Sequence, residues 1–267
     1  MKNKFFISMV LVLIVLGLSS CNKNSNTVTG PTISSGSIVL SANYFPNSDG
    51  SNYKYSITGT NSNKSNVSGT KVIWYNGYST LEGVVYQKEI DTVSVSSIPS
   101  VLTSFFIKTS SGVIFAFDTS GLSNIIPDTL MKYISFSPTL NILDFTQKTW
   151  NVFTVDLKYG VFPVIHLLNV SAASIDTENV VLNLGSGTQT VSAAKVQFTI
   201  TLNIPNPSNI LSLKTYSYIA YAWLAPNIGI IKWQGSGALL EVLSGQGINF
   251  SDTTASYTQS LISYSIK

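Results

Sequence analysis

The sequence contains no arginine, and its 267 residues include only one cysteine, Cys21, and one histidine, His166. Only 10% of the residues are charged, and the lysines are not clustered. Nucleic-acid binding depends on grouped lysine and arginine side chains, and structural zinc sites combine several cysteine or histidine ligands. The sequence therefore predicts no nucleic-acid partner, no metal site and no cofactor.

Few side chains are available for catalysis. His166 lies in the apolar stretch 161–168, which favours a structural or partly buried role over that of a catalytic base. No Gly-x-Ser-x-Gly turn presents a serine nucleophile. Glu89 and Asp91 share one strand face, and a solvated face is favoured there over a glycosidase-type carboxylate pair. We predict no catalytic residues and no enzyme, with an enzyme that uses scattered carboxylates as the minor alternative.

The N-terminal segment has the features of a secretory signal. A basic start at residues 1–4 precedes an apolar run over residues 5–18, and two small residues follow. The apolar run is shorter than the about 20 residues that span a bilayer. Leu18-Ser19-Ser20-Cys21 resembles the lipobox of bacterial lipoproteins. The resemblance implies a diacylglyceryl group on the Cys21 sulfur and cleavage before this residue.

The expected partner of this modified N-terminus is the membrane. Each buried methylene group contributes roughly 0.8 kcal/mol, so two or three acyl chains would hold the protein durably. Asn22 follows the cysteine, and lipoproteins similar in this respect usually reach the outer membrane. We predict a signal peptide at residues 1–20, a flexible polar tether at 21–38 and one domain at 39–267, because residues 22–37 are too polar to order themselves.

The remainder of the chain has sequence patterns that are typical of β-strands and turns. Residues 196–204 alternate between apolar and polar side chains, which indicates a strand with one buried face. Pro205 and Pro207 are predicted to end this strand. Residues 53–57 and 262–266 alternate in the same way. Asn76-Gly77 predicts a hairpin turn, as do the glycine-containing turns at residues 110–112, 185–187 and 234–237.

These patterns predict an all-β single domain with a large curved antiparallel sheet, either a half-barrel or a barrel-like meander. Helical signal is scarce, so at most one or two short helices are expected, with a candidate at residues 122–133.

Aromatic residues gather near the C-terminus. Tyr218 is predicted on one strand face, and Tyr221 and Trp223 on the other, with Trp233 on the next apolar segment. A strand that is apolar on both faces is either buried on both sides or lines a cavity. These four residues are the candidate ligand-binding set, and a packed central strand is the competing interpretation.

Two stretches of the sequence resemble β-rich envelope lipoproteins of uncharacterised function. The first is Tyr44-Phe45-Pro46, followed by Gly50 and Tyr53-Lys54-Tyr55, and the second is the stretch 221–232. The resemblance implies an open half-barrel, an architecture shared by the carrier and receptor of the outer-membrane lipoprotein sorting pathway. No functional residue is transferred from that pathway, because the chain has no arginine.

Two functions are therefore predicted. In the first, a membrane-anchored, non-catalytic envelope lipoprotein binds a hydrophobic ligand or lipid in the concave face of its sheet. In the second, a structural or surface-interaction lipoprotein has a filled core and no small-molecule ligand. The two differ in whether side chains occupy the concave face.

Overall fold

The computed structural model describes residues 35–60, 65–95, 98–116, 132–158, 164–206, 209–236 and 256–267. Cys21, the signal segment and almost all of the candidate helix at 122–133 lie outside these ranges. Within the described ranges, no helix is long and apolar enough to cross a membrane.

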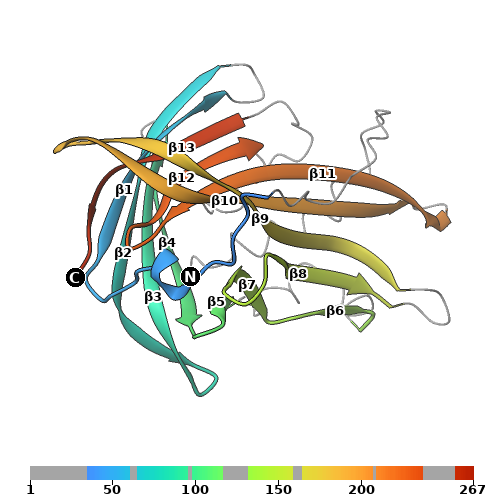
Figure 1. The fold of residues 1–267 in the computed structure, drawn as a ribbon. Coiled ribbons are helices and arrows are strands. Elements are labelled where there is room, and N and C mark those ends of the chain that lie inside the picture. Colours follow the sequence, from blue (N-terminus) through green and yellow to red (C-terminus); the bar gives the residue numbers. More distant parts are fainter. Residues whose placement is uncertain are drawn as a thin grey trace.

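The described residues form one 13-stranded antiparallel sheet that is not closed (Figure 1), as the sequence predicts. Its only described helical element is a single 3-10 turn, η2 (Ala42–Tyr44). The strands are β1 (Asn52–Thr60), β2 (Asn66–Leu81), β3 (Val84–Val95), β4 (Ile98–Lys108), β5 (Gly112–Ala116), β6 (Ile134–Phe136), β7 (Thr139–Asp144), β8 (Thr149–Leu157), β9 (Ile165–Leu184), β10 (Gly187–Asn206), β11 (Asn209–Ala225), β12 (Gly229–Ser236) and β13 (Ser256–Ser265).

The sheet is mostly a meander, with strand order β6-β8-β9-β10-β11-β12-β13-β1-β2-β3-β4-β5-β7. β1 pairs with β13, so the two ends of the described chain meet in the middle of the sheet. The predicted strand at 196–204 is confirmed within β10, where Val196 and Phe198 are buried. β10 ends at Asn206, between the two prolines that are predicted to stop it, although Pro205 itself still pairs with Leu213.

The predicted hairpin at Asn76-Gly77 is wrong. β2 runs past these residues and reverses at Glu82-Gly83, where φ values of 50° and 81° suit a two-residue hairpin turn. Asn76 and Gly77 lie in a bulge opposite β3, and Gly77 has φ 69°. The Gly77 N–H donates to the Asp49 carboxylate at 2.5 Å, so a loop across the strand fixes the bulge.

The other predicted turns have mixed outcomes. The turn at 110–112 is confirmed between β4 and β5, and the turn at 185–187 is confirmed between β9 and β10. The turn at 234–237 is wrong over its described part, because Gln234 to Ser236 pair with β13. The pairing of β12 with β13 therefore continues where the glycine content predicts a reversal of the chain.

The sheet curls until distant strands touch. The tip of the β9–β10 hairpin reaches β13, where the Gly185 N–H donates to the Ile262 carbonyl at 3.2 Å (Figure 1). At the other side, the Trp150 indole of β8 donates to the Asn141 carbonyl of β7 at 3.1 Å. The curled sheet thus encloses its own interior face, although the end strands β6 and β7 are not paired with each other in the described chain.

A segment N-terminal to β1 runs across this interior and binds both halves of the sheet. The Thr177 hydroxyl of β9 donates to the Gly36 carbonyl at 3.1 Å, and the Lys108 ammonium of β4 donates to the Phe45 carbonyl at 2.7 Å. The Phe45 ring packs edge-on against Phe106 with centroids 5.3 Å apart. Residues 36–38, placed in the tether from sequence, therefore contact the folded sheet.

The turn at Glu82-Gly83 gives a test of the β2–β3 reversal. A Cβ atom would meet nothing within 4 Å at Gly83 or at Gly185, but only Gly83 has a left-handed φ. We expect Gly83→Ala to lower the free energy of unfolding by about 1–2 kcal/mol more than Gly185→Ala, because an L side chain disfavours that conformation. Urea titration measures both values, and equal losses would contradict this turn.

Candidate functional site

The four aromatic residues predicted to bind a ligand do not share one face of the sheet. Trp233 contacts the Phe198 ring with centroids 5.3 Å apart, and Tyr218 is buried on that same interior face. Tyr221 and Trp223 lie on the opposite face and contact each other. Their ligand-binding role therefore stays a prediction, with two residues on each side of the sheet.

Charged side chains surround Trp223. Its indole N–H donates to the Glu178 carboxylate of β9. The ammonium groups of Lys195 and Lys232 lie 5.0 Å and 4.4 Å from the ring. Since cation–π contacts are attractive at these distances, Trp223 joins β9, β10, β11 and β12 through a single ring.

A charged cluster lies in the interior, where the sequence predicts solvated side chains. Glu89 and Asp91 do share one face of β3, but their exposed fractions are only 8% and 4%. The prediction of a solvated face is wrong because the spacing of two residues places them on one face of a strand but does not show which face is covered. In the ladder, Tyr75 of β2 lies opposite Glu89, and both side chains point inward.

Lys71 of β2 supplies the countercharge. Its ammonium lies 2.8 Å from Asp91 Oδ2, and both side chains are buried. Burial lowers the pKa of Lys71, but the Asp91 and Glu89 carboxylates outweigh this effect and leave the pKa raised. The other Asp91 oxygen, Oδ1, has no hydrogen-bond partner among the described residues. Lys71 and Asp91 therefore form a buried ion pair.

The Glu89 carboxyl group binds its proton more tightly than an exposed glutamate does. Burial raises the pKa of Glu89 to about 8, and the nearby Asp91 carboxylate adds to the rise. Lys71 and a hydrogen bond with Tyr75 oppose the rise without cancelling it. Burial also raises the pKa of Tyr55 and Tyr75 well above the usual value. The burial of the cluster leaves a substrate no access to either carboxylate.

A polar groove lies on the other face, across β7, β8 and β9, with a volume of about 700 Å³. In the β8–β9 ladder, Asn151 lies opposite Ser171 and Thr154 lies opposite Asn169. A register shift between Asn151 and Phe153 brings these two pairs to the same face. The side chains that define it are Asn141 and Asp144 of β7, Asn151 and Thr154 of β8, and His166 and Asn169 of β9.

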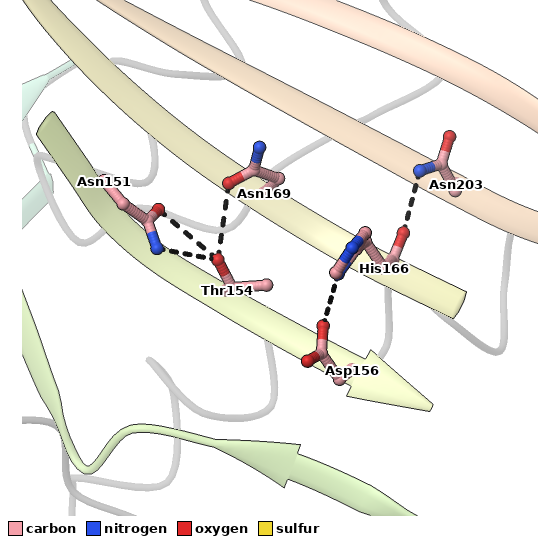
Figure 2. A network of polar contacts seen from close by, with 6 residues as sticks. All are labelled: Asn151, Thr154, Asp156, His166, Asn169 and Asn203. Carbon is pink, nitrogen blue, oxygen red and sulfur yellow. Dashed lines mark hydrogen bonds and ion pairs between the residues drawn. The ribbon is translucent and has the colours of Figure 1, made fainter. Parts of the chain in front are cut away.

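Hydrogen bonds order these groups (Figure 2). The Asn151 amide donates to the Thr154 hydroxyl at 2.9 Å, and this hydroxyl lies 3.4 Å from the Asn169 amide oxygen. At the far end of the groove, His166 Nδ1 lies 2.6 Å from Asp156 Oδ1. The Asn203 amide of β10 donates to the His166 carbonyl at 2.7 Å. The groove therefore contains two separate sets of oriented donors and acceptors, one around Thr154 and one around His166.

His166 corrects a second sequence-based interpretation. A structural or partly buried histidine was expected, but 62% of its side chain is exposed. Its neighbours Ile165 and Leu167 are buried, so the apolar run reflects the inner face of β9 while His166 points out. The sequence did not reveal the groove, because its asparagine and threonine residues resemble the rest of a chain rich in these types.

The groove is nearly neutral in charge. Asp144 lies at its edge, and its Oδ1 already accepts hydrogen bonds from the Thr146 N–H at 2.7 Å and hydroxyl at 2.6 Å. Among the described residues, no three histidine, cysteine, aspartate or glutamate side chains gather so as to hold a metal ion. The chemistry offered is hydrogen bonding by uncharged groups.

Comparisons with known proteins give a limited result. No family model and no curated protein matches the sequence. A candidate lipoprotein from Parabacteroides distasonis is structurally similar at 12% identity and TM-score 0.44, covering 83% of this chain and 98% of its own. A candidate exported protein with a YmcC-like fold from Bacteroides fragilis is similar at 13% identity and TM-score 0.42, with the same coverage of both chains.

The raised pKa of Glu89 predicts that the stability of the fold depends on pH. Its folded-state pKa of about 8 exceeds the unfolded value of 4.5, so the folded state binds the proton more tightly. This contribution is complete below pH 4.5 and is lost as the pH rises through 8. We expect urea unfolding to show falling stability from pH 5 to pH 8, by at most about 1.4 kcal/mol per pH unit.

Glu89→Gln should remove this dependence, because the amide stays neutral across the range. Glu82→Gln, on the exposed hairpin turn, is the matched control and should keep the slope of the unmodified protein. An unchanged slope in Glu89→Gln would show that Glu89 is ionised in the folded protein.

Proposed function

We propose that this protein is a lipid-anchored, non-catalytic lipoprotein of the bacterial envelope, held at the outer membrane through Cys21. The basic start, the apolar run and the Leu18-Ser19-Ser20-Cys21 motif support the proposal. Cys21 is the only cysteine, so no disulfide competes for its thiol. The described fold begins 14 residues later, at Ser35.

The filled interior is the observation that favours a surface-interaction role over a carrier role. Phe106, Leu143 and Leu224 are fully buried within one continuous core. Leu40 and Phe45, from the segment that crosses the interior, belong to that same core. Side chains therefore occupy the space that a hydrophobic ligand would need, and the exposed surface of the sheet is left for binding.

The burial of the two carboxylates on β3 supports the non-catalytic part of the proposal. Glu89 and Asp91 are closed off from solvent. General acid–base catalysis needs a titrating group that can reach a substrate proton, and the buried pair lacks that access.

The anchor is tested by changing the proposed attachment residue. Cys21→Ala should abolish incorporation of a palmitate analogue, because the thiol that receives the diacylglyceryl group is gone. Ser20→Ala keeps a small residue before the cysteine and should remain labelled. In-gel fluorescence measures the label, and density-gradient fractionation places the labelled protein in the outer membrane. Labelled Cys21→Ala, or an unlabelled wild-type chain, would sink the proposal.

The filled core is tested by native mass spectrometry of the lipidated protein. The expected spectrum shows the chain with its own anchor and no further lipid, because core side chains take up the interior. A stoichiometric second lipid that is lost in Trp233→Ala but retained in Trp74→Ala would instead establish the hydrophobic-ligand function. Trp74 is the matched control because its side chain is exposed on the outer face of β2.

A further inference from the structure

The groove across β7, β8 and β9 has the size of a ligand site. Its volume of about 700 Å³ falls within the range of roughly 300–1,000 Å³ that small-molecule sites occupy. Most of its lining lies on the strands β7, β8 and β9, and strands hold side chains in more constant positions than loops do. The groove therefore has both the space and the rigid support that specific binding requires.

The charge of the lining limits the ligand class. Among the described residues no lysine lines the groove, so a phosphate or carboxylate would find no lysine countercharge there. Asp144 is the one carboxylate in the described lining; it is buried, and its Oδ1 already accepts two hydrogen bonds from Thr146, so it offers a cation little. The apolar lining groups, Trp150 and Ala172, are buried. Anions, cations and apolar molecules are thus all poorly matched.

The remaining groups match hydroxyls. An asparagine amide presents two donors and an acceptor side by side, and a hydroxyl group both donates and accepts. Asn141, Asn151 and Asn169 bring three such amides to the groove, and Thr154 adds a hydroxyl between two of them. We infer that this groove binds an uncharged, polyhydroxylated ligand, a short neutral oligosaccharide, through these amides.

The hydrogen-bond network prepares the groove for this ligand. Thr154 Oγ1 contacts the amides of both Asn151 and Asn169, so the three side chains restrain one another (Figure 2). Side chains that are already ordered lose less conformational entropy on binding. Because the aromatic ring in the lining is buried, stacking contributes little, and hydrogen bonds have to supply most of the affinity.

The inference deepens the proposed surface-interaction function but does not depend on the lipid anchor. The test uses the lipidated protein in micelles of a detergent without a sugar headgroup. The probes are trisaccharides and hexasaccharides of glucose, mannose, galactose and xylose, together with trigalacturonic acid as an acidic comparator. Chemical-shift titration measures saturable binding of each probe.

Asn169→Ala should weaken the binding of the neutral oligosaccharide about tenfold, since it removes one hydrogen-bonding amide. Asn183→Ala is the matched control, because Asn183 is an exposed asparagine of the same strand, outside the groove. It should leave the affinity within about twofold. Thr154→Val should also weaken binding, because it removes the hydroxyl while keeping the volume of the side chain.

Three results would overturn the inference: no neutral probe binds saturably, trigalacturonic acid binds more tightly than every neutral probe, or Asn169→Ala and Asn183→Ala bind equally well. Failure of the anchor is separate, because it is read from palmitate labelling of Cys21 rather than from oligosaccharide titration. Failure of the surface-interaction role is read from a second lipid in the native mass spectrum.

Discussion

The whole architecture depends on covering the inner face of one strongly curled sheet. An open sheet with an apolar face must bury that face against something. Here the strands pack on one another across the interior, and Leu40 and Phe45 of the short segment before β1 complete the core. The segment's carbonyl at Gly36 is bound by β9 and its carbonyl at Phe45 by β4. A further bond joins the Asn227 N–H of the β11–β12 turn to the Asn43 carbonyl at 2.8 Å. Strands far apart in the sheet are thereby held to one short stretch of chain.

The covered interior is not purely apolar, and this has consequences for specificity. Lys71 and Asp91 are paired inside it, and Tyr53 and Tyr55 donate their hydroxyls to the backbone carbonyls of Pro46 and Ile230 at 2.8 Å. Buried polar groups are costly unless they are partnered, so alternative packings that break these pairs are disfavoured. The interior polar groups thus specify how the crossing segment and β12 sit against β1.

Sequence reasoning predicts the class of this fold well and its details unevenly. Alternation along residues 196–204 identifies β10, because a strand with one buried face has apolar side chains at every second position. The same rule cannot tell which face is covered, so Glu89 is assigned to solvent and His166 to the interior. Asn76-Gly77 has the composition of a hairpin turn, yet the distant Asp49 holds it as a bulge. The groove depends on how β7, β8 and β9 lie against one another, and no local sequence pattern shows this arrangement.

The crossing segment also leads directly back along the chain toward Cys21, and this gives the fold a mechanical property. Tension on the chain before Gly36 is resisted first by the bonds of Gly36 and Ile38 to β9. If these bonds yield, the pull reaches Phe45 and withdraws its ring from Phe106, which uncovers the core. A force applied to the chain before Gly36 would therefore act on the contacts that hold the crossing segment to the core.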